Sequence, residues 1–382
     1  MSQLNVQNLS NENEDGAPEI ANISDFSATS YMCPPKGTTA QRPSSSNPGD
    51  IRFNTDTASL EYYRGNTIGW TQIEMTSPDL DGGARGIAFG GNNGSAYTDI
   101  EYFTISTLGN ALDFGNLAAT KTAAGSCASR TRGIVASGQE PGTVTADIDY
   151  ITFSSTGDST DFGGDVTDSR DFSAGLADQT RGIFGGGRIT NPSTAGNVID
   201  YITMASGGNA LDFGDTRSTT LYYPMCLASS TRGIIGSGTG GSPSISQIDF
   251  ITISTTGNGV EFGTLSDNYG GVGASNSTRG LFAGGYNAPT AGVCNSITYI
   301  TIATKGNSVN FGDLTSNNRS LASATSKTRA CYMGGKTPSN SNVIQYVEIL
   351  TTGDATDFGD LAQSNSGQKG NIAGCSNGHG GL

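Results

Sequence analysis

The chain has 382 residues, of which 56 are glycine, 34% are hydrophobic and 14% are charged, and its formal net charge is −14. The length allows two domains or one large repeat domain, and the scarcity of Lys, Gln and Glu favours short strands and tight turns over helices. The negative charge argues against nucleic acid as a partner, because phosphate binding needs clustered Lys and Arg. No run of 18 apolar residues is present, so no membrane insertion is expected.

The first 48 residues are polar and rich in proline, with Pro34, Pro35, Pro43 and Pro48. They could not form a core alone. We therefore expect an extended attachment arm over 1–48, which is either disordered or ordered only against a partner. The start of the chain has no basic residue or apolar stretch of the signal-peptide type, which predicts synthesis in a cytosol without export by that route.

Residues 49–75 have a different character, with strand-forming and turn-forming residues in alternation and the only tryptophan, Trp70. The pattern predicts a small β module, which is too small to be stable by itself. We expect it to pack on other copies or on the rest of the chain. A linker over 76–82 follows.

Three landmarks then recur six times in the same order, at intervals of about 50 residues. The first is an Arg followed by a small residue and a hydrophobic stretch, the second is Ile-x-Tyr-Ile-Thr, and the third is an acidic residue followed by Phe-Gly. The recurrent arginines are Arg85, Arg132, Arg181, Arg232, Arg279 and Arg329. The recurrent phenylalanines are Phe114, Phe162, Phe213, Phe262, Phe311 and Phe358.

Each repeat predicts four strands: the Arg segment, the Ile-x-Tyr segment, the Phe-Gly segment, and a small polar segment that leads to the next Arg. A Gly-Asn or Gly-Asp dipeptide, such as Gly208-Asn209, predicts a tight hairpin between the second and third strands. Four short antiparallel strands cannot bury both faces alone, so the repeats must pack face to face. The first and last repeats carry the same landmarks as the others. The sequence thus predicts an all-β fold, a six-bladed β-propeller over 83–382, with a β-solenoid as the alternative.

Two stretches resemble known families. Residues 49–63, Gly-Asp-Ile-Arg-Phe-Asn-Thr-Asp-Thr-Ala-Ser-Leu-Glu-Tyr-Tyr, and the nearby Trp70 resemble a small β module of tailed-bacteriophage structural proteins, especially those infecting cyanobacteria. Residues 4–9 and 16–18 resemble the attachment segment of such proteins, and the repeat resembles kelch-type repeats of phage tail proteins, although it lacks the Trp that kelch blades carry. The resemblance implies a virion component with an N-terminal anchor and a displayed propeller.

The recurrent Arg and Phe residues have structural interpretations. A Phe in the acidic-Phe-Gly segment is expected to form a wedge between blades. A buried Arg needs a partner, and the acidic residues of the same segments are the simplest ones. A ring of arginines that binds an anion is the alternative. The expected partners are Asp113, Asp161, Asp212, Glu261 and Asp357, with Asn310 in the fifth repeat.

The segments that follow the Arg strand vary between repeats and should emerge on one rim, where binding is expected. Asn and Tyr side chains there suit a glycan or a protein surface, and solvated turns are the alternative. The candidate binding residues are Asn92, Asn93, Tyr97, Glu140, Arg188, Asn191, Tyr286, Asn287, Lys336 and Asn340.

No catalytic residue, cofactor or metal site is predicted, and we expect no enzyme. His379 is the only histidine, so a catalytic triad that depends on histidine is not expected. Asp149, Asp200 and Asp249 could pair as in glycan hydrolases, but they occupy the same place in successive repeats, which favours a structural role. The six cysteines form no C-x-x-C pair and are expected to be buried thiols.

The function that this sequence favours is that of a phage tail fibre or adhesin that contacts the host surface. A capsid or neck decoration protein and a glycan-cleaving spike are the alternatives. The expected partners are other virion proteins through residues 1–75, further copies of the chain, with a trimer favoured, and a host glycan or protein. The expected location is the virion, after synthesis in the host cytoplasm.

Overall fold

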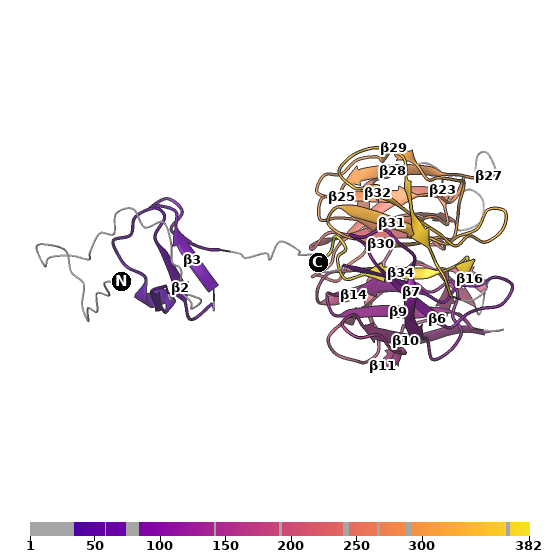
Figure 1. Ribbon diagram of the computed structural model, residues 1–382, viewed down its shortest axis with the longest axis horizontal. Helices are drawn as coiled ribbons and strands as arrows, with labels where there is room; N and C mark the ends of the chain where they lie inside the picture. The colour runs from indigo at the N-terminus through magenta and orange to yellow at the C-terminus, as the bar shows by residue number, and fades with distance from the viewer. Residues whose placement is uncertain are drawn as a thin grey trace, which may run out of the picture. The chain divides into compact units, whose positions relative to one another are not determined.

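The computed structural model describes residues 34–57, 59–73, 84–140, 143–190, 193–239, 244–265, 268–287, 292–363 and 367–382. Most of the predicted arm, the predicted linker 76–82 and the candidate Asn191 lie outside these ranges. The chain divides into two compact units, Met1–Asp79 and Leu80–Leu382. Nearly all regular structure in the described residues is strand, which confirms the prediction of an all-β chain (Figure 1).

The smaller unit contains one four-stranded sheet in the order β1-β2-β3-β4, with β1 parallel to β2 and the other pairs antiparallel. Its strands are β1 (Lys36–Gly37), β2 (Ile51–Asn54), β3 (Ser59–Tyr63) and β4 (Trp70–Gln72), and a 3₁₀ helix, η1 (Thr39–Gln41), follows β1. Strand β1 and helix η1 come from residues that the sequence assigns to the arm. The sheet therefore starts earlier than the predicted module.

A buried acid organises this small sheet. Glu61 is fully buried, and its carboxylate lies 2.6 Å from the guanidinium of Arg42 and 3.6 Å from that of Arg52. The Arg42 hydrogen bond is the main reason that the pKa of Glu61 falls below its ordinary value. Trp70 packs on Tyr63, with 5.5 Å between ring centroids. A charge network thus takes the place of a large apolar core, as the small size of the module requires.

The larger unit contains six four-stranded antiparallel sheets in its described residues, each with one strand of every predicted kind. The innermost strands are small and are β34 (Ala373–Ser376), β8 (Gly125–Ala128), β13 (Ala174–Ala177), β19 (Met225–Ala228), β24 (Val272–Ser275) and β30 (Ala322–Thr325). The Arg strands beside them are β5 (Arg85–Phe89), β9 (Arg132–Glu140), β14 (Arg181–Gly185), β20 (Arg232–Thr239), β25 (Arg279–Ala283) and β31 (Arg329–Met333).

The other two strands complete each sheet toward the outside. The Ile-x-Tyr strands are β6 (Asp99–Thr104), β10 (Thr143–Thr152), β17 (Val198–Thr203), β21 (Ser244–Thr252), β28 (Ser296–Thr301) and β32 (Val343–Glu348). The outermost Phe-Gly strands are β7 (Leu112–Asn116), β11 (Thr160–Asp165), β18 (Leu211–Asp215), β22 (Val260–Thr264), β29 (Val309–Asp313) and β33 (Thr356–Asp360).

Two small three-stranded sheets lie beside the main ones. The first consists of β12 (Arg170–Asp171), β15 (Arg188–Thr190) and β16 (Ser193–Ala195). The second consists of β23 (Asn268–Tyr269), β26 (Tyr286–Asn287) and β27 (Gly292–Val293). Both join a segment that precedes an inner strand to the variable loop of the same sheet.

The grouping of strands differs from the prediction. Each small strand pairs with the Arg strand that follows it, so a sheet takes its inner strand from the end of the preceding repeat. The turn between them is short and is fixed by a polar side chain, such as Ser129, whose Oγ accepts the N–H of Arg132 at 3.0 Å. As a result, the last strand of the chain, β34, pairs with the first Arg strand, β5, from Ala373 opposite Phe89 to Ser376 opposite Gly86.

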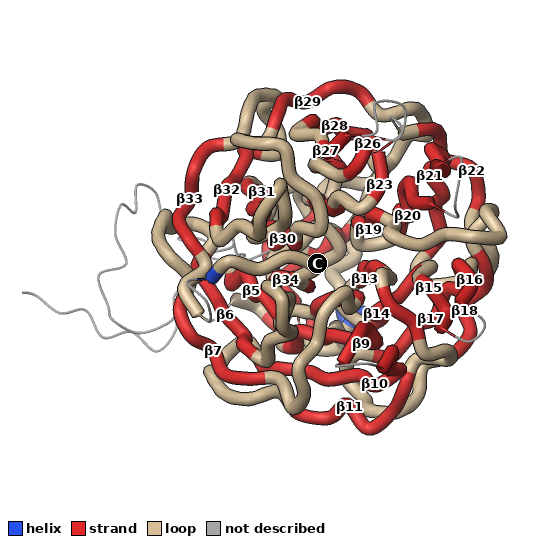
Figure 2. The backbone as a smooth tube through the Cα atoms, turned by 90° about the vertical axis from the view of Figure 1, so that its right-hand side faces the viewer, coloured by secondary structure: helices blue, strands red, loops and turns tan. Residues whose placement is uncertain are grey.

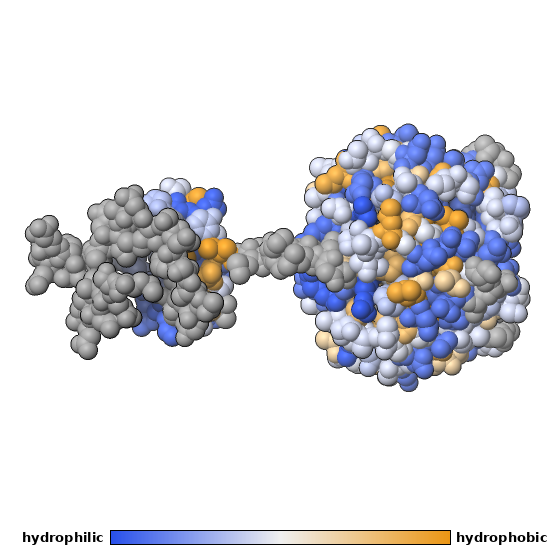
Figure 3. Space-filling view, in the orientation of Figure 1, coloured by the Kyte–Doolittle hydropathy of each residue, from blue (hydrophilic) through white to orange (hydrophobic). Residues whose placement is uncertain are grey.

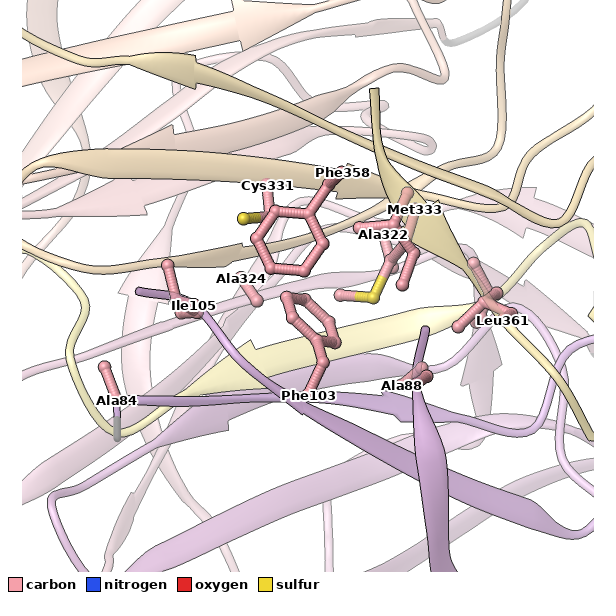
Figure 4. Close-up of a cluster of buried hydrophobic side chains, with 13 residues drawn as sticks. Ala84, Ala88, Phe103, Ile105, Ala322, Ala324, Cys331, Met333, Phe358 and Leu361 are labelled. Atoms are coloured by element: carbon pink, nitrogen blue, oxygen red, sulfur yellow. The ribbon is translucent and has the colours of Figure 1, made fainter. Parts of the chain in front are cut away.

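The inner strands follow one another in a closed cycle of contacts, from β8 through β13, β19, β24, β30 and β34 back to β8 (Figure 2). The apolar core has the same cyclic organisation, because each of its six clusters of buried side chains joins two successive sheets. In the cluster between the last and first sheets, Phe358 faces Phe103 with 5.2 Å between ring centroids (Figure 4). Each recurrent Phe lies in such a cluster, as a wedge between sheets should.

Outer strands carry apolar residues that remain exposed. Leu112, Leu211 and Val260 directly precede the acidic residue of the Phe-Gly segment, Val309 precedes Asn310 at the same place, and each of the four is about half exposed. Figure 3 shows one side of the larger unit, where hydrophobic residues are dispersed among hydrophilic ones. The Phe two residues further along is buried, and the strand pairing shifts register at that Phe, so simple alternation does not hold there.

The Gly-Asn and Gly-Asp turns have a role that the sequence did not indicate. Strand β6 and strand β7 are joined by residues 105–111, so Gly109-Asn110 is part of a longer loop rather than a two-residue hairpin. Each such turn packs on the outer strand of the preceding sheet. The Oδ1 atom of Asn110, for example, accepts the N–H of Asp360 at 3.0 Å, which joins the first sheet to the last.

This docking predicts the effect of two glycine substitutions. Gly115 has φ of +150°, and a Cβ atom there would overlap the carbonyl of Gly157 in the neighbouring turn. Gly157 has φ of +154°, but a Cβ atom there would meet no atom within 4 Å. Because of the overlap, we expect Gly115→Ala to cost about 1–3 kcal/mol of unfolding free energy and Gly157→Ala clearly less. Urea unfolding of both variants checks this, and equal costs would contradict the close packing of turn on strand.

Candidate binding site at the loop rim

Six residues at equivalent positions, just before the inner strands, form a ring at one end of the larger unit. All six have a left-handed backbone, with φ between +51° and +70°. The N–H of each donates to the carbonyl of the preceding member at 2.7 to 3.3 Å, and the first donates to the last, so the cycle closes. The members are Ala123, Phe172, Tyr223, Gly270, Ser320 and Asn371. A left-handed conformation costs a residue other than Gly about 1 kcal/mol, and here the closed cycle of hydrogen bonds maintains it.

A cavity of about 120 Å³ lies at this ring and is lined by ring members and by the inner strands. A second hollow of about 60 Å³ is lined by other residues of the inner strands and by His379. The two hollows together extend along the inner strands. All six members of the ring line the first, and His379 of the C-terminal segment lines the second.

The variable loops lie beside the ring because their glycines bond to the segments that carry it. The N–H of Gly91 donates to Lys121 at 2.9 Å, and that of Gly187 donates to Leu221 at 2.8 Å. Gly285 and Gly335 make the equivalent bonds to Asn318 and Lys369. Each loop is therefore attached to the segment that leads into the next sheet.

Several predicted binding residues of the first and last loops hold the rim together. The amide of Asn340 donates to the carbonyl of Asn92 at 2.5 Å. Lys369 lies 5.7 Å from the ring of Tyr97. The backbone N–H of Asn93 bonds to Ser95 at 3.1 Å within the first loop. The contact of Asn340 with Asn92 thus joins the last loop to the first, and these side chains are already engaged within the protein.

The other predicted residues lie in separate places. Glu140 is half-buried at the end of β9, where burial raises its pKa above the ordinary value. Lys336 is exposed, and its backbone bridges to Arg319. Asn287 donates through its amide to Asn268 at 2.9 Å. Asn191 lies outside the described residues.

Tyr286 belongs to a group of aromatic side chains that the sequence did not predict, and Arg188 lies beside this group. Arg188 forms two hydrogen bonds to the carboxylate of Asp171, at 3.0 and 2.5 Å, and lies 5.4 Å from the ring of Phe172. Tyr286 packs on Tyr269 with 5.4 Å between ring centroids. We name the whole group the aromatic shelf, and its members are Phe172, Tyr222, Tyr223, Tyr269 and Tyr286.

The shelf residues that were not predicted, Phe172, Tyr222, Tyr223 and Tyr269, precede the inner strands. The predicted binding residues all lie at or after the ends of the Arg strands. A signal was present in the sequence. At the positions equivalent to Phe172 and Tyr223 the other repeats have Ala123, Gly270, Ser320 and Asn371, so the aromatic residues are not required by the repeat. Residues that depart from a repeat are better candidates for function than those that define it.

The recurrent arginines have other partners than the expected acids. Each stacks on the aromatic residue of the Ile-x-Tyr strand in its own sheet, with 4.5 to 4.9 Å from guanidinium carbon to ring centroid. Each also donates to a main-chain carbonyl at the end of that strand in the next sheet, as Arg181 does to Ile253 at 3.0 Å and Arg329 to Ile105 at 3.2 Å.

The expected pairing of these arginines with the acidic-Phe-Gly acids was therefore wrong. Within the described ranges, no recurrent Arg contacts Asp113, Asp161, Asp212, Glu261, Asp357 or Asn310. Those side chains lie on the outer strands and are exposed, whereas the Phe that follows each of them is buried at a register shift of the strand pair. The carbonyls that end the adjacent strands satisfy the guanidinium instead.

This arrangement predicts what substitution of Arg181 does. Arg181→Ala removes a stacked cation and its hydrogen bond to Ile253, so we expect a loss of about 1–3 kcal/mol in the free energy of unfolding. Asp212→Asn should change it by less than about 0.5 kcal/mol, since this exposed acid has no such partner. Denaturant unfolding of the two variants checks these partners. Comparable losses of unfolding free energy would instead support an ion pair between Arg181 and Asp212.

The carboxylates considered for hydrolysis are occupied in buried ion pairs. Asp200 is fully buried and lies 2.6 Å from Arg170. Asp249 accepts from Arg217 at 2.7 Å, and Asp149 lies 3.6 Å from Lys121. The loss of either partner would leave a buried charge alone, so these pairs fix the loop segments to their sheets.

His379 belongs to the C-terminal segment that meets the second hollow. Its Nε2 atom lies 2.6 Å from the carbonyl of Ala128, and its Nδ1 atom accepts the N–H of Gly381 at 3.1 Å. A neutral imidazole satisfies both bonds, whereas a protonated one would lose the second. Burial is the main cause that lowers its pKa below 6.5, and Arg130 also lowers it, while the Ala128 carbonyl and Asp178 oppose this.

The lowered pKa of His379 predicts a dependence of stability on pH. The unfolded chain binds a proton near pH 6.5 more readily than the folded one does, so this contribution is complete above pH 6.5 and is lost as the pH falls toward the folded pKa. We expect acidification from pH 7.5 to 5.5 to lower the melting temperature less in His379→Gln than in the native chain. Identical shifts in the two proteins would show that His379 does not contribute.

Four of the cysteines are buried in the sheets, namely Cys127, Cys226, Cys331 and Cys375, and Cys294 is half-buried. Burial raises the pKa of Cys226 to about 12 and raises the pKa values of Cys127, Cys331 and Cys375 well above the ordinary value of a thiol. These thiols are protonated at neutral pH and act as small apolar side chains.

Within the described ranges, no three His, Cys, Asp or Glu side chains are grouped so that they could hold a metal ion. No helix in that part of the chain is long and apolar enough to cross a membrane. The chain matches no protein-family model and no curated protein.

Proposed function

We propose that the six four-stranded sheets are the blades of a six-bladed β-propeller with a phage tail adhesin function. Three cyclic features support the propeller: the contacts between inner strands, the apolar clusters between successive sheets, and the hydrogen bonds of the ring from Ala123 to Asn371. In each of them the last repeat joins the first. An electron cryo-microscopy map of the full chain tests the proposal, and an open spiral of sheets would refute it.

The adhesin proposal is carried by the variable loops and the aromatic shelf, which lie on the same rim as the 120 Å³ cavity. A scaffold that repeats almost unchanged, with non-repeating aromatic and polar residues gathered at one end, is typical of a binding protein. The resemblance of residues 49–63 to a module of cyanobacterial phage particles suggests the setting. In this proposal the smaller unit attaches to the particle, and the propeller contacts the host surface.

Antibodies raised against the chain test this function directly. Gold-labelled antibody should mark the tail of intact particles, and antibody fragments should block adsorption to host cells. Label on the capsid or neck, with normal adsorption, would contradict the adhesin and support the decoration role. Release of soluble products from host polysaccharide by the purified chain would instead support the glycan-cleaving spike.

The proposed partner of the smaller unit is the particle, together with further copies of the chain in a trimer. In the smaller unit Ile51, on β2, and Ile68, before β4, are 53% and 56% exposed, and burial of these side chains in a contact between copies would stabilise a trimer. Light scattering should give three times the chain mass for the native protein and a smaller value for Ile51→Asp. A native monomer would refute the trimer.

A further inference from the structure

The aromatic shelf is a continuous row of rings at the mouth of the cavity. Phe172 and Tyr223 are nearly stacked, with 4.1 Å between centroids and an interplanar angle of 33°. Tyr223 continues the row to Tyr269 at 6.4 Å. Phe172 and Tyr223 also line the cavity, and all five shelf residues keep part of their surface accessible. Rings in such a row present flat apolar faces, and the tyrosines add hydroxyl groups at the edges. Such a surface suits a ligand that has an apolar face and polar groups around it.

Positive charge flanks this shelf. Arg188 lies over Phe172, and 37% of its side chain is exposed although Asp171 binds it. Arg319 acts on Tyr223 and Tyr269 electrostatically and is joined through its backbone to the exposed Lys336. Burial raises the pKa of Tyr223 to about 12 against the effect of both arginines, so its hydroxyl is neutral at physiological pH.

This local charge has the opposite sign to that of the whole chain. Among the described residues, two cations, Arg188 and Arg319, and one acid, Asp171, act electrostatically on the tyrosines of the shelf. The chain as a whole carries −14. The shelf therefore combines a local positive charge with aromatic faces on an otherwise acidic protein. This combination favours ligands that carry negative charge and an apolar face.

We propose that the aromatic shelf binds an acidic saccharide, with a sugar ring stacked on Tyr223 and Tyr269 and a carboxylate of the saccharide facing Arg188 and Arg319. Stacking uses the apolar C–H face of the sugar, and the Tyr hydroxyls supply hydrogen bonds at its edge. Arginine is suited to the carboxylate because its planar group can form parallel hydrogen bonds. This inference rests on the adhesin function and names the ligand class of its site.

Titration calorimetry of the full chain tests the site, with oligogalacturonides as the acidic probe and maltooligosaccharides of equal length as the neutral one. We expect heat of binding for the acidic probe only, and affinity about tenfold or more lower in Tyr269→Ala and in Arg319→Gln. Tyr62→Ala is the matched control, because Tyr62 lies on β3 of the smaller unit and outside the shelf. Its affinity should be that of the native chain.

Other results would overturn the inference. Equal affinity for neutral and acidic probes would remove the role of charge, and an unchanged affinity in both shelf variants would place the site elsewhere. Inorganic sulfate that competes as well as the saccharide at equal ionic strength would indicate a simple anion site. Melting curves of each variant separate loss of binding from loss of folding, and Arg319→Gln changes a side chain that lies partly in solvent.

Binding to whole host cells distinguishes this inference from the adhesin function. If the native chain and the shelf variants bind cells equally, the function stands and the saccharide site is wrong. If the chain binds cells only before protease treatment of their surface, the ligand is a protein and the saccharide site is again wrong. If the chain binds no cells but binds the acidic probe, the site stands and the adhesin function falls.

Discussion

Removal of residues 373–382 should unfold the larger unit at room temperature, although only ten residues of the sequence are lost. The deletion removes β34, which supplies the inner strand of the first sheet through its pairing with β5. It also exposes apolar surface in the cluster between the first and second sheets, since Ala373 and Cys375 are buried there. The expected loss exceeds about 5 kcal/mol, which is the whole stability of many domains.

Circular dichroism during urea unfolding measures this effect, because the only tryptophan lies in the smaller unit and would not report on the larger one. The control is a deletion of residues 380–382, which leaves β34 and His379 in place. We expect the control to lose at most a few kcal/mol. A similar, mild effect of both deletions would show that the first sheet is stable with three strands and that closure contributes little.

The sequence predicts which segments become strands because the landmarks recur, but not how the strands are grouped. A small segment such as Ala322–Thr325 has two neighbours along the chain and no side chain large enough to prefer one. The signal that decides it is local. Ser326 lies three residues before Arg329 and bonds to its N–H, and a Ser, Asp or Asn stands three residues before the recurrent Arg in every repeat except the first. This turn forms a hairpin between each small strand and the Arg strand that follows it.

The partners of the recurrent arginines could not be predicted from charge alone. Pairing by charge ignores burial, because Phe213 is buried between two sheets whereas Asp212, which precedes it, is exposed on the outer strand. The carbonyl of Ile253 leaves no mark in the sequence, because every residue has one. Main-chain partners of buried cations become visible only when strand ends from different repeats are placed side by side.

Only part of the candidate site could be predicted, because its residues also come from different repeats. Arg188 and Tyr286 lie in variable loops and were identified there, whereas Tyr223 and Tyr269 lie in segments that approach the inner strands. Those segments come from different repeats and meet only because the ring from Ala123 to Asn371 brings their backbones together. A repeat analysis that compares residues between repeats, and not only along one of them, would have identified the aromatic exceptions.

Phe311→Ala should be among the most destabilising single substitutions in the chain, with a cost of about 3–5 kcal/mol. Phe311 is 3% exposed and packs edge-on against Tyr299 at 6.1 Å. Its cluster includes Leu281 from its own sheet and Val347 from the next, so the cavity left by Ala would weaken the contact between two sheets. The cost should exceed that of a residue buried within a single sheet, because both sheets lose packing partners.

Val309 provides the matched control, since it lies two residues away on the same strand and is 56% exposed. Val309→Ala should cost less than about 0.5 kcal/mol, because its side chain is largely in water in the folded state. Denaturant midpoints of the two variants, measured with the same slope, give the comparison. If the two costs were similar, the Phe-Gly strand would be a peripheral edge rather than a wedge, and the apolar clusters could not be what holds successive sheets together.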